Sequence, residues 1–233
     1  MKYNKNRIKT AVLTASMIGG TSAVSKASTL AINFLGGRYS AAKLADVSGT
    51  AFGIDAGDWT NTSDTPNGST TLDGVSFTWT ASTEWSQANT FSGTAGAEEI
   101  YHGYLDDGGS GATVSISGLS AWLGSNTSYT ITFIGSGDST TTDIRDNVPL
   151  FVSDGGASLG SFSINQVITS GGRHSGFGEI SGLTSDTLFI DGLPRSGSAR
   201  GGIAGIAIVA VPEPSSTLLV GLGALTLVIR RKR

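Results

Sequence analysis

The sequence predicts an all-β protein: a single antiparallel β-sandwich or jelly roll, with an N-terminal signal peptide before it and a short C-terminal hydrophobic helix after it. From Leu30 onward, apolar and polar residues alternate in short bursts, which is the period-2 pattern of half-buried strands. Turn-forming residues separate the bursts, and the 233 residues include 34 glycines. The chain has no cysteine, which excludes disulfide scaffolds, thiolate metal sites and cysteine nucleophiles.

The N-terminal segment has the features of a secretory signal peptide over residues 1–27. Its first nine residues carry four cations, residues 10–24 are mildly apolar, and small residues stand at Ser25 and Ala27. Cleavage is expected between Ala27 and Ser28, with Ala23 as the alternative. The other interpretation, an amphipathic N-terminal helix, is disfavoured by the Gly-Gly break at residues 19–20.

The body, residues 28–210, is predicted to be one β-sandwich. Residues 203–209 are apolar on both faces of a strand, which predicts a central position in a sheet. Helix is expected only at residues 41–47 and 120–123, and the absence of a strict repeat disfavours a β-solenoid. The predicted strands are residues 31–34, 51–54, 75–80, 100–105, 113–116, 129–134, 149–152, 161–164, 177–180, 187–190 and 203–209.

Four segments of the body resemble bacterial jelly-roll modules of the galactose-binding-like and malectin-like kind. In such modules a tyrosine-containing strand and a last strand of similar composition lie in the core. The resemblance therefore implies the sandwich fold rather than a particular ligand. The segments are Gly103 to Asp107, Ala112 to Leu119, Tyr129 to Phe133 and Ile203 to Ile208.

Catalysis is not expected from the body. Its adjacent acidic pairs, at residues 98–99 and 106–107, point to opposite faces if they lie in strands, so neither pair alone focuses two carboxylates on one bond. His102 and His174 accompany no nucleophile elbow and are expected to be surface or turn residues. Asp106 and Asp107 stand in a glycine-rich segment that could bind calcium, although an Asp-Gly hairpin turn between the flanking strands explains the same residues. No other cofactor or metal is expected.

The tryptophans suggest a ligand. Trp79 alternates with Val75 and Phe77 and is expected in the core. Trp59 and Trp85 have polar neighbours and are expected in loops, where an exposed indole could stack on a sugar ring. They are the predicted glycan-binding residues.

The C-terminal segment, residues 211–233, combines Pro212-Glu213-Pro214 with an apolar run at residues 217–229 and a basic end. Thirteen helical residues span about 20 Å, short of the roughly 30 Å hydrocarbon core, so the predicted transmembrane helix is a marginal anchor. A terminal basic cluster belongs on the cytoplasmic side, which places the body outside the membrane. This cluster consists of Arg230, Arg231, Lys232 and Arg233.

This tail resembles the PEP-CTERM sorting signal of exosortase-bearing Gram-negative bacteria, also catalogued as an ice-binding-protein C-terminal motif. The resemblance covers about the last 22 residues. It implies recognition by a membrane-embedded exosortase that cuts near the motif. The apolar tail would then anchor the protein in the inner membrane only transiently. The alternative is an ordinary C-terminal anchor that stays in place.

Charge and topology together predict an exported protein of the cell surface, extracellular matrix or biofilm matrix. Residues 28–211 hold six of the 15 cations and 17 of the 18 acids, and such an acidic body disfavours nucleic acid as a partner. Binding of extracellular polysaccharide is the leading hypothesis for the body. The alternatives are a structural or adhesive component without a defined ligand and a polysaccharide hydrolase.

Overall fold

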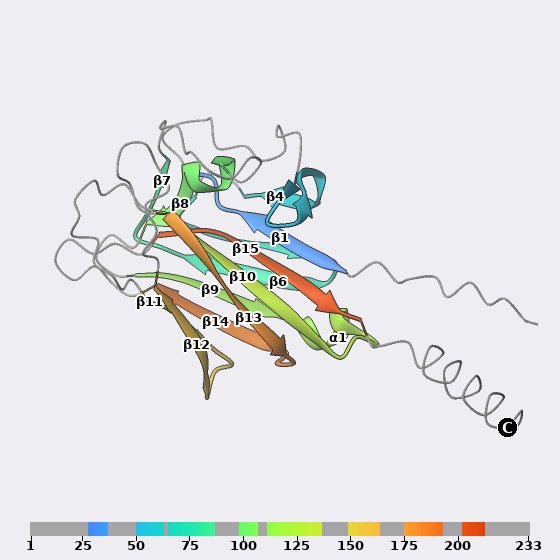
Figure 1. Ribbon diagram of the computed structural model, residues 1–233. Coiled ribbons are helices and arrows are strands. Elements are labelled where there is room, and N and C mark those ends of the chain that lie inside the picture. Colours follow the sequence, from blue (N-terminus) through green and yellow to red (C-terminus); the bar gives the residue numbers. More distant parts are fainter. Residues whose placement is uncertain are drawn as a thin grey trace, which may run out of the picture.

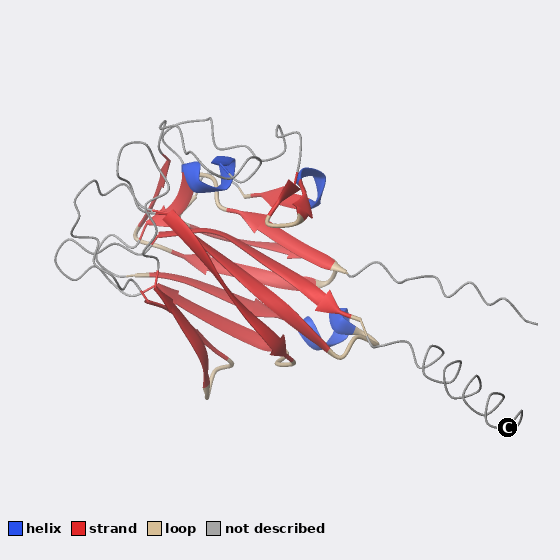
Figure 2. Ribbon diagram, in the orientation of Figure 1, coloured by secondary structure: helices blue, strands red, loops and turns tan. Residues whose placement is uncertain are grey.

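The fold is described by a computed structural model over residues 28–36, 50–62, 65–86, 98–106, 111–136, 149–163, 175–192 and 202–212. These residues form two stacked β-sheets with little helix, so the predicted all-β class is confirmed (Figures 1 and 2). The predicted helical turn at residues 120–123 is confirmed as part of α1, whereas residues 41–47 lie outside the described residues. The helical segments are η2 (Ala56–Asp58), η3 (Glu98–His102) and α1 (Leu119–Leu123).

The larger sheet has seven strands and runs in the order β13-β10-β15-β1-β4, with β8 pairing with both β15 and β7. Its neighbours are antiparallel except β1 and β4, which run parallel and depart from the predicted antiparallel arrangement. The strands are β1 (Thr29–Asn33), β4 (Trp59–Asn61), β7 (Thr83–Ser86), β8 (Gly103–Asp106), β10 (Ser128–Ser136), β13 (Ser175–Leu183) and β15 (Gly202–Val211).

The smaller sheet has six antiparallel strands in the order β12-β11-β14-β9-β6-β5. A separate two-stranded ribbon pairs β2 (Thr50–Ala51) with β3 (Ile54–Asp55). The strands of the smaller sheet are β5 (Asn67–Leu72), β6 (Val75–Thr80), β9 (Ala112–Ser117), β11 (Pro149–Ser153), β12 (Ser158–Ser163) and β14 (Thr187–Gly192).

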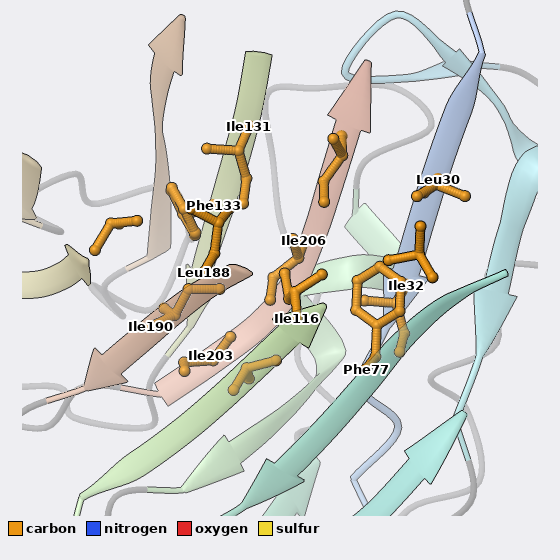
Figure 3. Packing of buried hydrophobic residues seen from close by; sticks show 14 of the residues in the cluster. Leu30, Ile32, Phe77, Ile116, Ile131, Phe133, Leu188, Ile190, Ile203 and Ile206 are labelled. Carbon is orange, nitrogen blue, oxygen red and sulfur yellow. The ribbon is translucent and has the colours of Figure 1, made fainter. Parts of the chain in front are cut away.

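The main core fills the space between the two sheets (Figure 3). Alternation determines which residues of β6 enter this core: Val75, Phe77 and Trp79 are buried, while Thr78 and Thr80 are exposed. Ile32 and Ile206 enter the same core from the larger sheet, and Trp79 lies in it as predicted. The core is thus built from the inward positions of each strand, as the period-2 pattern requires.

The centre of the opposite face of the larger sheet is also covered. A second apolar cluster lies there, in which Ala31, Ala204 and Ala207 of β1 and β15 meet Ile100 and Tyr101 of η3. Strand β15 is therefore buried on both faces and pairs with β10, β1 and β8, which confirms the predicted central position of residues 203–209. The smaller sheet has no comparable cluster among the described residues, so the two outer faces differ.

Two predicted strands are wrong in part. The chain turns within residues 51–54, because Phe52 and Gly53 have φ of 54° and 74° and connect β2 to β3. Residues 98–102 form η3, and only residues 103–106 of the predicted strand 100–105 continue as β8. Both segments cover the outer side of the larger sheet. Their apolar residues are buried there although they belong to neither of the two main sheets.

Three strands were absent from the prediction. Strand β5 has only one apolar residue, yet the two-residue Asp73–Gly74 turn pairs it with β6. Both turn residues have positive φ, 47° and 84°, as a type I′ hairpin requires. Strands β4 and β7 are short and lie at the margins of the larger sheet.

The predicted hairpin between the strands at Tyr104 and Thr113 is also wrong. Strand β8 pairs with β7 and β15, whereas β9 pairs with β6 and β14. Strands β8 and β9 therefore belong to different sheets and do not form a hairpin with each other.

Candidate functional site

On the smaller sheet, the outward positions of β5, β6, β9 and β14 are mostly exposed and polar. Burial alternates along β5, β6, β9 and β14, so every second side chain of these strands points away from the core. We call this set the hydroxyl face. It consists of Asn67, Ser69, Thr71, Ser76, Thr78, Thr80, Thr113, Ser115, Ser117, Thr187, Phe189 and Asp191.

Strand register arranges the hydroxyl face in rows that cross the strands. In the middle row Ser69 lies opposite Thr78, Thr78 opposite Ser115, and Ser115 opposite Phe189. Phe189 in turn lies opposite Ser153 of β11. Adjacent strands are about 4.8 Å apart, so each row presents a closely spaced line of side chains.

A groove lies at the Phe189 end of this row. It has a volume of about 490 Å³ and is lined by the β11–β12 hairpin together with Phe189 and Asp191. The Phe189 ring is 38% exposed, although Leu188 and Ile190 on either side of it are buried in the core. A Cβ atom on Gly155 would lie 3.1 Å from Cε2 of Phe189, so the ring packs directly against the glycine backbone.

Asp154 shapes the hairpin beside the groove. Its Oδ1 accepts hydrogen bonds from the backbone N–H groups of Gly156, at 3.1 Å, and Ala157, at 2.8 Å. These two donors hold the pKa of the Asp154 carboxyl below its ordinary value, because they stabilise the carboxylate. Gly155 has φ of 92°, a conformation that side-chain-bearing residues rarely adopt, so both the glycine and the aspartate are suited to this turn.

The two tryptophans predicted to bind glycans lie elsewhere. Trp59 is in β4 and is 5% exposed, within the second apolar cluster, so its predicted loop position is wrong. Trp85 is in β7, partly buried against the same cluster, and not in a loop. Neither residue belongs to the hydroxyl face, and their glycan-binding role stays a prediction.

Of the two residues predicted to bind calcium, the structure describes only Asp106. Asp106 is the last residue of β8, is buried, and accepts a hydrogen bond of 3.5 Å from the hydroxyl of Thr83, whereas Asp107 lies outside the described residues. In the part of the chain that the structure describes, no three His, Cys, Asp or Glu side chains gather as a metal site would require. His102 ends η3, and His174 lies outside the described residues.

The two ends of the body meet at one end of the sandwich. The Ala210 N–H donates to the Ser28 carbonyl at 2.9 Å, which joins the start of β1 to the end of β15 (Figure 1). The carbonyl of Val211 accepts a hydrogen bond from the Thr127 N–H at 3.2 Å. The folded body thus reaches the Val211–Pro212 peptide bond, and the Pro-Glu-Pro sequence begins without a linker. Ala27, Glu213, Pro214, Arg230, Arg231, Lys232 and Arg233 lie outside the described residues.

Comparison with known proteins bears on this C-terminal end. Residues 210–233 match the PEP-CTERM protein-sorting motif. The PEP-CTERM tail implies export, sorting to the cell envelope and processing by exosortase, a membrane protein. No curated protein and no solved structure matches the chain. The body is therefore interpreted from its own geometry.

The predicted transmembrane helix at residues 217–229 falls outside the described residues. Within the described ranges, none of the helices is long and apolar enough to span a membrane.

Sequence reasoning missed Phe189, Asp154 and Gly155. The signal for Phe189 was present, because it alternates with Leu188 and Ile190 and must face away from them in a strand. The Asp-Gly-Gly sequence at residues 154–156, between two predicted strands, was a hairpin signal. What the sequence did not reveal is that the hairpin closes against the Phe189 ring.

Proposed function

We propose that this protein is a cell-surface or extracellular-matrix component whose body binds extracellular polysaccharide without catalysing a reaction. The PEP-CTERM tail sorts it to the envelope, and we further propose that residues 217–229 anchor it in the inner membrane until exosortase acts. The body then operates among the polymers that surround the cell.

The observation that carries the binding role is the hydroxyl face. Serine and threonine hydroxyls both donate and accept hydrogen bonds, which matches the mixed donor and acceptor character of sugar hydroxyls. The exposed Phe189 ring offers a flat apolar surface of the kind on which the C–H face of a sugar ring can stack.

The proposal is tested with the processed protein recovered from its native host. Affinity electrophoresis through gels containing the host's own extracellular polysaccharide should retard it relative to gels without polymer. Migration that is unchanged by every polysaccharide fraction would contradict the binding role and favour the structural or adhesive alternative. Release of shortened glycan fragments during the same incubation would favour the hydrolase instead.

A further inference from the structure

We propose that the hydroxyl face is the polysaccharide-contact surface, that it takes a neutral glycan, and that Phe189 is its stacking platform. This inference rests on the proposed function and assigns it a site and a ligand class. It starts from the difference between the two outer faces of the sandwich.

The two outer faces differ in cover, because the larger sheet exposes Phe177 and Glu179 at its β13 margin while its centre is buried. On the larger sheet the outward residues Ala31, Ala204 and Ala207 are buried beneath η3 and the β2–β3 ribbon. On the smaller sheet the outward residues Ser69, Thr78 and Thr113 are exposed. A ligand that lies across several strands can therefore reach the sandwich through the hydroxyl face.

The charge of this face selects a neutral ligand. Asp191 is its one ionisable side chain, and the face has no lysine or arginine. An anionic polymer would meet no cation here and would be repelled by the acidic body, in which residues 28–211 hold 17 acids and six cations. Protein interfaces are enriched in tryptophan, tyrosine and arginine and depleted in serine, so the composition also disfavours a protein partner.

The Phe189 ring is an apolar surface that is held in place on the hydroxyl face. Its ring is held against Gly155, so little side-chain freedom remains to be lost when a sugar stacks on it. Two hydrogen-bonding side chains flank the ring: Ser153 directly across on β11, and Asp191 two residues along β14. Asp191 accepts hydrogen bonds from hydroxyl groups without requiring a charged ligand.

The rows of side chains set the direction in which a glycan chain would lie across the sheet. The middle row crosses β5, β6, β9, β14 and β11, a span of about 19 Å at roughly 4.8 Å per strand step. An extended glycan placed along this row would stack on Phe189 at one end and meet Ser115, Thr78 and Ser69 in succession. The geometry thus favours a linear polymer over a free monosaccharide.

The test compares two exposed phenylalanines. Phe189→Ala removes the proposed platform, and Phe177→Ala is the matched control, because Phe177 is 46% exposed on β13 of the other sheet. In affinity electrophoresis with neutral polysaccharide, Phe189→Ala should raise the dissociation constant about tenfold or more, as truncation of a buried aromatic anchor commonly does. Phe177→Ala should bind as the unaltered protein does, and Phe189→Trp should retain binding.

Two further measurements separate the claims. Thr78→Val removes one hydroxyl in the middle of the row and should weaken binding several-fold while circular dichroism stays unchanged. Binding to a carboxylated polymer should be weaker than binding to a neutral one.

If the unaltered protein binds glycan but Phe189→Ala and Thr78→Val bind equally well, the assigned face is wrong and the proposed function stands. If the unaltered protein binds no glycan, both are wrong.

Discussion

Individual side chains of this sandwich are fixed by close contacts with glycine. Gly155 lets Phe189 approach the hairpin backbone, and Gly68 of β5 lies under the Trp79 ring. The Nε1 group of Trp79 donates to the Thr65 carbonyl at 3.1 Å, which fixes the indole over that strand. In both places the missing side chain of a glycine, in a turn or in a strand, makes room for an aromatic ring from a neighbouring strand.

Replacing Gly68 by alanine should destabilise the protein. The new Cβ would lie 2.8 Å from Cε2 of Trp79, a residue only 3% exposed, so the ring must shift within a packed core. Overpacking of this kind costs about 1–3 kcal/mol of unfolding free energy, measurable by urea denaturation. Ser69→Ala, at the next and exposed position, is the control and should change stability by no more than about 0.5 kcal/mol. Equal stability of the two variants would show that the indole has room to move.

Acid should loosen the β11–β12 hairpin only at low pH. The Asp154 pKa is lowered from its ordinary value of 3.8 in the folded state, so its stabilising effect is fully present above pH 3.8 and is lost as the pH falls through the lowered pKa. The amide resonances of Gly156 and Ala157 should therefore titrate with a midpoint below 3.8. Asp154→Asn keeps an oxygen acceptor and should abolish this titration. A midpoint at or above 3.8 would contradict the hydrogen-bonded role of the carboxylate.

At the level of elements, the most constrained strand is β15. It pairs with β10, β1 and β8, and its side chains enter both apolar clusters. It is also continuous with the PEP-CTERM tail, whose match begins at residue 210. The last strand of the fold and the sorting signal therefore adjoin, and processing upstream of Val211 would remove part of a central strand.

The tail itself should be needed for delivery. Replacing Pro212-Glu213-Pro214 by alanines removes the helix-disfavouring break before the apolar run, and replacing the four terminal cations by serine removes the cytoplasmic anchor. Each variant should accumulate unprocessed in cell fractions of the native host, as followed by immunoblotting. Ser69→Ala, at an exposed position of β5 away from both predicted cleavage sites, is the control and should be processed normally. Normal processing and delivery of both tail variants would refute the sorting role of these residues.

At the scale of the whole molecule, β1 begins where β15 ends, so the first and last strands of the described fold meet at one end of the sandwich. Pairing of the first and last strands makes the fold depend on contacts that span almost the whole described chain. Such long-range pairing forms only after the last strand is available. The body cannot complete its larger sheet until residues 202–211 have crossed the membrane.

This order can be tested with two truncations expressed in the native host. A chain ending at residue 212 retains all of β15 and should resist limited proteolysis after export. A chain ending at residue 201 lacks the central strand, exposes the apolar residues of β1 and β10, and should be degraded. Equal protease resistance of the two chains would show that the larger sheet is stable without β15.

The sequence alone determined the features that are read locally. The PEP-CTERM tail was evident from its linear sequence, because a sorting enzyme and a membrane recognise charge, proline and apolar length without a folded partner. Strands such as β6 and β9 followed from alternation over a few residues, since the side chains of a strand must point to alternate faces. Strand β15 followed instead from a short run that is apolar on both faces. Strand β5 escaped this rule because it has almost no apolar residues and is held by its pairing with β6.

Only the tertiary structure decided which side chains are exposed. Trp59 has polar neighbours in sequence but is buried in the second apolar cluster, whereas Phe189 lies in an apolar strand and stays exposed. Alternation with Leu188 and Ile190 directs Phe189 to the other face of its strand, but nothing within a few residues of either aromatic side chain decides its exposure. It depends on which strands pair and which face of each sheet acquires a second layer, and those contacts join residues far apart in the chain. The candidate site could therefore be located only once the two sheets and their unequal outer faces were known.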